Sequence, residues 1–328
     1  MVAKEMIPSR SEIFRSLELY ILQKDLQTEA ERKKHHLALT FQSSDHRSIK
    51  HIVVASGSYD PLTLAHETIF TAAKEAVQQK NYKDAPEDAS VLVVSSTAHY
   101  DKRIDLQKNS TVPDRMLALE TLYAPRAKSF VGMFNDPYFV NLAPQVQKMF
   151  PQANLGFVMG TDVLEQIANE EEQRRRGFDP KQVFDILFQH EFLVSARTYL
   201  FRGEKKFVTR DLLLEACPHL QMYEKNIQPF AVPEKISTSD LLVADMSSTL
   251  AREKVNKSES LNGVVHSSVE AFISRWKLYQ QNEPTNSWYE KSVHLRNQHA
   301  DSFGKESFNR VNFYSLAVDS LMDDLERL

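Results

Sequence analysis

Short apolar runs alternate with amphipathic segments from residue 51 onward. The runs are rich in β-branched and aromatic residues, which is typical of strands that are covered on both faces. They lie at residues 51–55, 91–94, 129–134, 155–159, 191–195 and 227–232. Stretches with helical periodicity, at residues 65–80, 112–124 and 138–150, separate the first four of these runs. This alternation predicts βαβ units and a parallel sheet.

The predicted order of elements defines a fold class before any chemistry is considered. Strands that alternate with covering helices form an α/β fold with an open, doubly wound, Rossmann-like parallel sheet. In such sheets a ligand binds beyond the carboxyl ends of the strands. Residues that directly follow the predicted strands are therefore the first place to search for function.

The first 50 residues follow another pattern, and we expect them to form a helical N-terminal extension. Apolar residues such as Ile13, Leu17 and Ile21 recur at helical spacing within residues 11–40. The polar stretch at residues 42–50 is expected to be a linker to the main body.

The last part of the chain, residues 282–328, is expected to be a helical C-terminal extension that begins at a polar boundary. Its apolar stripe, expected to dock on the body or on a partner helix, comprises Phe308, Val311, Val318, Leu321 and Leu325. Residues 51–281 lie between the two extensions as one domain. Within that domain, glutamates at 170–172 stand one helical turn before arginines at 174–176, which predicts a solvated helix with ion pairs.

Composition narrows the classes of function. The 328 residues carry a formal net charge of −4, so no global basic field attracts nucleic acid or an anionic membrane. The single cysteine, Cys217, allows no intramolecular disulfide and suits a reducing compartment. The N-terminus lacks the apolar core of a signal peptide, and no stretch approaches the roughly 18 apolar residues of a membrane span. We expect a cytoplasmic protein, with the nucleus open as a second compartment in a eukaryote.

A first candidate anion site follows the first predicted strand, in the stretch SGSYDPLTLAH at residues 56–66. Gly57 allows the backbone to approach a ligand closely, and amides at the start of the next helix favour a bound phosphate. His66, in the first turn of that helix, would add a side-chain donor. The alternative is an ordinary βα turn with a capping residue.

A second candidate anion site lies far downstream, in DMSSTLAREKV at residues 245–255, after the apolar run at 241–244. It offers three hydroxyls before a helix and an arginine one turn into it: Ser247, Ser248, Thr249 and Arg252. Hydroxyls at a helix start combined with an arginine can bind an anion, although a serine-rich N-cap is the alternative. Two such sites, each after a predicted strand, favour phosphate binding.

These stretches resemble the nucleotidylyltransferase superfamily, and most closely the nicotinamide and nicotinate mononucleotide adenylyltransferases. GSYDPLTLAH resembles the first signature, a glycine-x-phenylalanine-x-proline followed by a (His/Thr)-x-Gly-His element. MSSTLAR resembles the second, Ile-Ser-Ser-Thr-x-x-Arg, and FVMGTDVLEQI resembles the Gly-Ala-Asp-x-Leu-Glu segment. LNGVVHSSVEAFISRWKLY, at residues 261–279, resembles the closing helix of the family. The resemblance covers residues 51–280 in the family's order.

The resemblance implies transfer of the AMP moiety of ATP. A phosphate oxygen of the acceptor attacks the α-phosphate in line and pyrophosphate leaves, with no covalent enzyme intermediate. The implied acceptor is nicotinamide or nicotinate mononucleotide, and the product is NAD or its deamido form. Magnesium (Mg2+) is expected to bridge phosphate oxygens, with no metal site formed by protein ligands alone.

The resemblance also implies which residues are catalytic. His66 is expected to donate to the α-phosphate, and Arg252 is expected to bind the departing β- and γ-phosphates. Lys102, with Arg103 as the alternative in a shifted register, is expected to contact the acceptor phosphate.

Further positions are implied as binding residues. Those expected to hold ATP phosphates are Gly57, Ser58, Tyr59, Thr63, Ser247, Ser248 and Thr249. Gly160 and Asp162 fall where the family contacts the adenosine ribose. The family's tryptophan-and-threonine segment, which holds the pyridine ring, is absent from the matching residues 134–146. Phe134 and Tyr138, or Phe139, are the expected substitutes as a stacking face.

Two departures leave alternatives open. Ala65 replaces the glycine before the catalytic histidine and would place a methyl group near the phosphates. The stretch KISTSDLL, at residues 235–242, resembles a segment of cytidylyltransferases, although MSSTLAR has an arginine at the required offset. The alternatives are cytidylyl or adenylyl transfer to another phosphorylated small molecule, and a weakly catalytic nucleotide-binding scaffold. The terminal extensions are candidate surfaces for a protein partner or a homo-oligomer.

Overall fold

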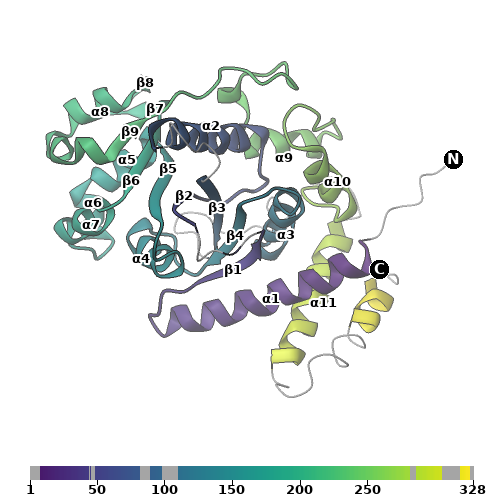
Figure 1. Ribbon diagram of the computed structural model, residues 1–328. Coiled ribbons are helices and arrows are strands. Elements are labelled where there is room, and N and C mark those ends of the chain that lie inside the picture. The colour runs from purple at the N-terminus through teal and green to yellow at the C-terminus, as the bar shows by residue number, and fades with distance from the viewer. Residues whose placement is uncertain are drawn as a thin grey trace.

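In the computed structural model, the chain is built around a seven-stranded sheet with helices on both of its faces (Figure 1). The structure describes residues 8–43, 45, 49–81, 89–97, 110–280, 286–304 and 318–325. The strands of this sheet are β1 (Leu37–Gln42), β2 (His51–Gly57), β3 (Ala89–Ser96), β4 (Ser129–Phe134), β5 (Asn154–Gly160), β6 (Glu191–Ser195) and β9 (Ile227–Pro229). The six predicted strands are therefore present.

The order of the strands defines the fold class. Across the sheet the order is β1-β4-β3-β2-β5-β6-β9, and every neighbouring pair is parallel except β1 with β4. Counted along the chain, the parallel strands run 3-2-1-4-5-6, which is the Rossmann order. The prediction of a doubly wound α/β fold is confirmed. Its switch point, where the direction of strand order reverses, lies between β2 and β5.

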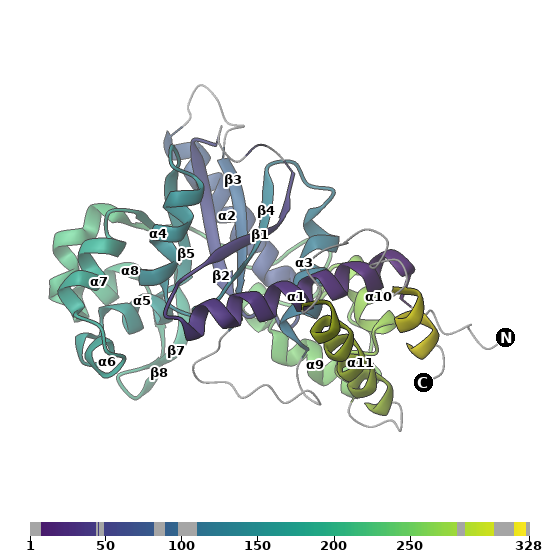
Figure 2. The same cartoon turned by 90° about the horizontal axis from the view of Figure 1, so that it is seen from below.

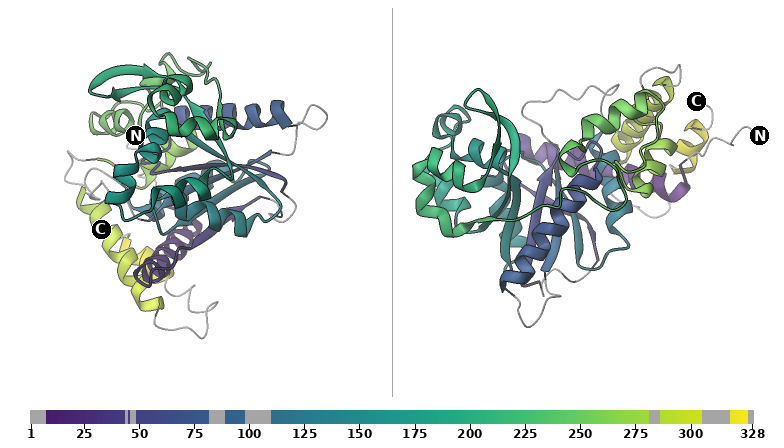
Figure 3. Two further views of the ribbon diagram at one scale, coloured as in Figure 1. Left: turned by 90° about the vertical axis from the view of Figure 1, so that its left-hand side faces the viewer. Right: turned by 90° about the horizontal axis from the view of Figure 1, so that it is seen from above.

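Side chains of β2 show why this sheet is covered on both faces. Val53 and Ala55 belong to one apolar core, which contains residues of the helices α1 (Arg10–Glu31), α2 (Leu64–Asn81), α3 (Val112–Tyr123), α10 (Ser267–Arg275) and α11 (Asn286–Gly304). Ile52 and Val54 point to the opposite core, against α4 (Phe139–Met149), α5 (Thr161–Ala168), α7 (Pro180–Leu187) and α8 (Arg210–Ala216). Successive residues of a strand face opposite sides, so an uninterrupted apolar run fills both cores. The two layers of helices are visible in Figure 3.

Three further elements lie at the edges of this architecture. The hairpin β7 (Arg197–Phe201) and β8 (Glu204–Val208) forms a separate two-stranded antiparallel sheet after β6. The short helix α6 (Glu170–Arg175) and its C-cap Arg176 form two of the three expected pairs, with 2.7 Å between Glu170 and Arg174 and between Glu172 and Arg176. Arg175 pairs with Glu172 instead of Glu171. The helix α9 (Ser248–Asn256) follows a 3₁₀ turn at Val243–Asp245, and another 3₁₀ segment spans Pro218–Asn226.

Two predictions of local structure are wrong. The helix expected over residues 11–40 ends at Glu31, and residues 37–42 form β1. Leu37 is buried, and its strand pairs with the outer edge of β4, which gives that edge its backbone partners. The run at 241–244, expected to be the final strand, makes only one isolated bridge and turns into a 3₁₀ helix, so that β9 is the last strand of the sheet.

The helices of the two ends of the chain pack against each other. Helix α1 begins with a capping box, in which Ser9 and Glu12 satisfy each other's backbone N–H groups. Figure 2 shows α11 beside α1. Val318, Leu321 and Leu325 are buried in the same core, as the apolar stripe predicts, whereas Phe308 and Val311 lie outside the described residues. The division at residues 50 and 281 stays a prediction.

Candidate functional site

The turn between β2 and α2 occupies the switch point of the sheet. Its residues 58–63 follow the carboxyl end of β2, which lies between β3 and β5. A Cβ atom at Gly57 would lie 3.0 Å from the ring of Tyr59, so glycine allows this ring to fold back over the strand. Tyr59 has a φ of +44° and is 4 % exposed. Its side chain is therefore part of the core, and only its backbone is available to a ligand.

His66 lies in the first turn of α2, and Thr63 fixes its orientation. The backbone N–H of Thr63 donates to Nδ1 of His66 over 3.1 Å, and the Thr63 hydroxyl lies 2.8 Å from the same atom. Because Nδ1 accepts from an N–H, the ring proton lies on Nε2, which is then a hydrogen-bond donor. Burial, together with the charge of Arg197, lowers the pKa of His66 to about 4. The ring is therefore neutral at pH 7 and can donate a hydrogen bond without carrying a charge.

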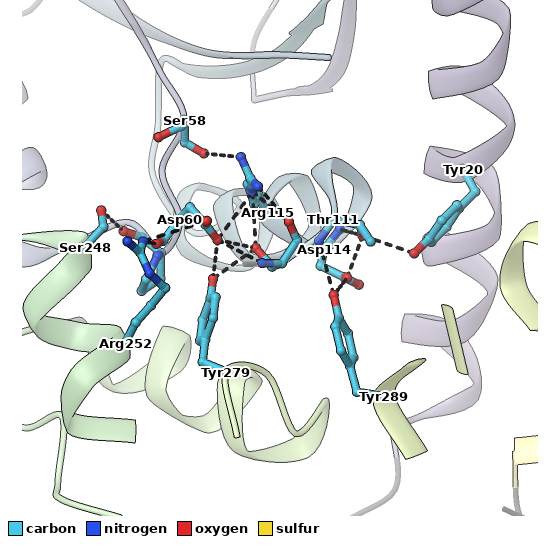
Figure 4. Close-up of polar contacts among 12 residues, drawn as sticks. Tyr20, Ser58, Asp60, Thr111, Asp114, Arg115, Ser248, Arg252, Tyr279 and Tyr289 are labelled. Carbon is cyan, nitrogen blue, oxygen red and sulfur yellow. Dashed lines mark hydrogen bonds and ion pairs between the residues drawn. The ribbon is translucent and has the colours of Figure 1, made fainter. Parts of the chain in front are cut away.

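The start of α9 docks on the same turn, as Figure 4 shows. The Ser248 hydroxyl donates to the carbonyl oxygen of Pro61 over 2.8 Å, a contact between residues 187 positions apart. The guanidinium of Arg252 donates to the carbonyl oxygen of Asp60 and, over 3.2 Å, to the hydroxyl of Thr249. Ser247 caps the helix by accepting from the N–H of Leu250. The two stretches predicted to bind anions thus lie in direct contact.

This docking also separates the two candidate second signatures. Ser248 and Arg252 contact the β2–α2 turn directly. In the competing stretch at residues 235–242, Ser239 packs instead against Gly263, where an added Cβ would lie 3.0 Å from the serine hydroxyl. Ile236 and Leu241 of that stretch pack against the cluster that contains Ala65, so both stretches lie near the start of α2. MSSTLAR is the one whose polar side chains bond to the β2–α2 turn.

The carboxylate of Asp60 connects the turn to neighbouring segments of the chain (Figure 4). Its Oδ1 atom accepts from the N–H of Ser110 over 3.0 Å, from the Ser110 hydroxyl over 2.7 Å and from the Tyr279 hydroxyl over 2.8 Å. The guanidinium nitrogens of Arg115 and Arg252 lie 3.5 Å and 3.8 Å from its oxygens. Sequence reasoning missed this role for Asp60, Ser110 and Arg115, because their contacts join segments that no local pattern connects.

The carboxyl end of β5 contributes a second corner of the site. A Cβ atom at Gly160 would lie 2.2 Å from both Cδ of Arg197 and Oδ1 of Asp162, so no other residue fits here without displacing them. Oδ2 of Asp162 pairs with Nη1 of Arg197 over 3.3 Å. Oδ1 of Asp162 is buried and has no hydrogen-bond partner among the described residues. The sequence analysis did not assign Arg197 to the site. Its position, two residues after the predicted strand at 191–195, could have identified it as a candidate.

Of the residues predicted to bind the acceptor, the structure describes the aromatic ones but not the basic ones. The expectation that Phe134 stacks on a ligand is wrong, because its ring is 1 % exposed in the core below β4. Tyr138 packs edge to face on Phe178, with ring centroids 5.0 Å apart, and its role stays a prediction. Phe139 packs in the same way on Phe157. Lys102 and its alternative, Arg103, lie outside the described residues.

Ala65 has a structural explanation. It is buried in a small apolar cluster with Val243 and Met246, which precede α9. Its methyl group joins α2 to the segment that precedes α9, and its nearness to bound phosphates stays a prediction.

Some kinds of site are not formed by the described residues. Within the described ranges, no group of three or more histidine, cysteine, aspartate or glutamate side chains could hold a metal ion. Burial raises the pKa of the Cys217 thiol, which disfavours the nucleophilic thiolate. In the part of the chain that the structure covers, no helix is long and apolar enough to cross a bilayer.

Comparisons with known proteins give a likeness of fold. No family model and no curated protein matches the chain. Among solved structures, it is similar to nicotinic acid mononucleotide adenylyltransferase of Plasmodium falciparum complexed with NaAD, with 17 % identity and a TM-score of 0.46. The same enzyme complexed with APC gives 16 % identity and a TM-score of 0.45, and each match covers 71 % of this chain and 98 % of that chain. The fold and the site define a Rossmann-like α/β protein with a candidate anion site at its switch point.

Proposed function

We propose that the protein transfers the AMP moiety of ATP to the phosphate of a mononucleotide, either nicotinamide or nicotinate mononucleotide. The products are pyrophosphate and NAD or its deamido form. The observation that carries the proposal is the docking of the α9 start on the β2–α2 turn beside His66. In-line transfer without a covalent intermediate requires donors and positive charge placed around phosphates, and no nucleophilic side chain. His66 is such a donor, and Arg252 supplies the positive charge beside the same turn.

Each part of the site has a role in the proposed reaction. The Nε2–H group of His66 donates to the α-phosphate, where negative charge develops. Arg252, held in place by Asp60 and Thr249, binds the phosphates that leave as pyrophosphate. The buried Oδ1 atom of Asp162 accepts from a ribose hydroxyl, which supplies its missing partner.

Magnesium fits this site as a companion of ATP rather than as a resident ion. The carboxylate of Asp60 is already surrounded by two hydroxyl groups, an N–H group and two guanidinium groups. The carboxylate of Asp162 is paired with Arg197. Magnesium would therefore be held through the phosphate oxygens of ATP, where it neutralises charge on the leaving group.

The choice of nucleotide and acceptor is tested by product analysis. ATP and CTP are offered separately with nicotinamide mononucleotide, nicotinate mononucleotide or phosphocholine, and the products are identified by mass. We expect a dinucleotide from ATP and a pyridine mononucleotide, and no product from CTP. A product from CTP and phosphocholine would replace the proposal with cytidylyl transfer.

Substitution of Arg252 tests its assignment to the outer phosphates. Arg252→Ala is expected to weaken ATP binding by at least about tenfold and AMP binding by less than about twofold, because AMP lacks the phosphates that Arg252 contacts. Calorimetric titration of both nucleotides measures the difference. Lys254→Ala, on the same helix but paired with Glu259, is the matched control and should change neither affinity. Equal weakening of ATP and AMP by Arg252→Ala would contradict the assignment.

Substitution of Gly160 tests whether Gly160 and Asp162 contact the ribose of the nucleotide. Gly160→Ala is expected to weaken ATP binding by about tenfold, because the added methyl would displace Asp162 and Arg197. Both displaced groups are side chains, so the midpoint of thermal unfolding should change little. Adenosine affinity is measured in parallel, since it shares the ribose and lacks the phosphates. Unchanged adenosine and ATP affinities would remove Gly160 and Asp162 from the nucleotide site.

A further inference from the structure

Arg197 extends over the switch point from the first position of the β7–β8 hairpin. Its Cγ and Cδ atoms lie 3.1 Å and 2.2 Å from the place where a Cβ atom of Gly160 would be, so the side chain crosses the end of β5 in close contact. Its Nη1 atom is 3.3 Å from Oδ2 of Asp162. The side chain is 53 % exposed, so its guanidinium is accessible to a ligand.

The proposed reaction requires positive charge near the α-phosphate. His66 cannot supply it, because its ring is neutral. The ring of His66 accepts at Nδ1 from Thr63 and is a neutral donor at Nε2. Its ring neighbours are the aromatic rings of Tyr59 and Phe70, with centroids 5.6 Å and 6.4 Å away, and neither carries a charge at neutral pH. Transfer at the α-phosphate develops charge on its oxygens, and stabilisation of that charge is the main catalytic demand.

The other two arginines described around the turn are engaged elsewhere. Arg115 is 4 % exposed and donates to the carbonyl oxygen and the hydroxyl of Ser110. Arg252 donates to Asp60 and Thr249, on the side of the turn where α9 begins. The side chain of Arg197 lies at the end of β5, which pairs with β2 on the side away from β3, and its charge contributes to the low pKa of His66. Of these three arginines, Arg197 is therefore the one best placed to share a ligand with His66.

We infer that Arg197 is a catalytic residue whose guanidinium contacts the α-phosphate beside His66. The inference rests on the proposed function. The carboxylate of Asp162 sets the geometry, because Oδ2 holds the guanidinium while Oδ1 is available to a ribose hydroxyl. The α-phosphate attached to that ribose then lies between Arg197 and His66. As the acceptor phosphate oxygen forms its bond to the α-phosphorus, the bond to the β-phosphate oxygen breaks, and pyrophosphate departs with the electron pair.

The first test compares ligands with and without an α-phosphate. Arg197→Gln is expected to weaken AMP binding by about tenfold and to leave adenosine binding unchanged, as calorimetry measures. Arg197→Lys keeps a positive charge and should recover most of the AMP affinity. Arg202→Gln, on the same hairpin but bonded to the carbonyl oxygen of Ala216, is the matched control. Equal weakening of AMP and adenosine would overturn the inference, since Arg197 would then only orient Asp162.

The second test measures turnover and the state of His66. Arg197→Gln should lower kcat by about 10²-fold, a larger effect than that on binding, because charge is greatest in the transition state. The pKa of the His66 ring, followed by NMR, should rise in the same variant. Unchanged kcat would overturn the catalytic role. Absence of turnover in the unmodified protein, with intact and Arg197-dependent AMP binding, would overturn the proposed function and the catalytic role, and would leave Arg197 as a residue that binds the α-phosphate. Absence of AMP binding would overturn both the proposed function and the contact with the α-phosphate.

Discussion

Replacement of His66 with alanine is expected to lower kcat by about 10²-fold or more and to change the Kd for ATP by less than about threefold. The reason is geometric. Thr63 holds the ring so that Nε2–H is the donor, and this donor is needed most when charge develops on the α-phosphate. Initial rates of pyrophosphate release give kcat, and calorimetry gives the Kd.

Two further variants sharpen this test. His66→Gln retains an amide N–H donor and should keep more activity than His66→Ala. His294→Ala removes an exposed histidine from α11 and serves as the matched control. Because burial lowers the pKa of His66 to about 4, the ring stays neutral as the pH falls from 8 to 5.5, and the rate should not decline for this reason. An unchanged kcat in His66→Ala, or a decline near pH 6.5 that the glutamine variant abolishes, would contradict the role.

Replacement of Arg296 with methionine is expected to lower the free energy of unfolding by about 3–5 kcal/mol. Arg296 of α11 and Asp114 of α3 are both 0 % exposed, and Nη1 lies 2.6 Å from the carboxylate. The guanidinium also stacks over the rings of Trp276 and Tyr20, at 4.4 Å and 5.1 Å from their centroids. Its loss would leave a buried carboxylate without a cation. Urea denaturation measures the change.

Two comparisons identify the buried charge as the cause. The double variant Arg296→Met with Asp114→Asn should recover part of the lost stability, because no buried charge is then left unpaired. Arg32→Met breaks an exposed pair with Glu29 and should cost less than about 1 kcal/mol. If Arg296→Met were as mild as Arg32→Met, the buried pair would not hold the terminal helices on the body.

The buried pair is connected to the candidate site through two adjacent residues, Ser110 and Thr111. The hydroxyl of Thr111 donates to Asp114, a member of the buried pair. Thr111 donates its N–H to the Tyr289 hydroxyl of α11, while the preceding residue, Ser110, contacts Asp60 and Tyr279 (Figure 4). The C-terminal segments therefore support the floor of the β2–α2 turn. The extensions of the chain are part of the structure that positions the site.

The parallel sheet could be predicted from sequence because its strands are covered on both faces. A short, mostly apolar run such as residues 51–55 is typical of a strand that is buried on both faces. The edge strand β1 could not be predicted in this way. Its sequence, LALTFQ, continues the pattern of the preceding helix, and only the unpaired edge of β4, far away in the chain, makes it a strand.

The site was predictable where its chemistry is local. His66 stands in a short motif at the end of β2, and Arg252 stands in a short motif at the start of α9. Their motifs could be recognised locally, but the docking of α9 on the β2–α2 turn could not. Asp60 could not be assigned, because its partners Ser110 and Tyr279 lie 50 and 219 positions away. Phe134 was misassigned because the face of a strand residue cannot be read where both faces are buried.

The most direct test of the account is pyrophosphate release from ATP and magnesium, with nicotinamide and nicotinate mononucleotides offered separately and the product identified by mass. We expect release with at least one of these acceptors, together with a dinucleotide of the matching mass. If no pyrophosphate is released with either acceptor although ATP binds, adenylyl transfer to a pyridine mononucleotide would be contradicted. The site would then be a nucleotide-binding site that does not carry out this reaction.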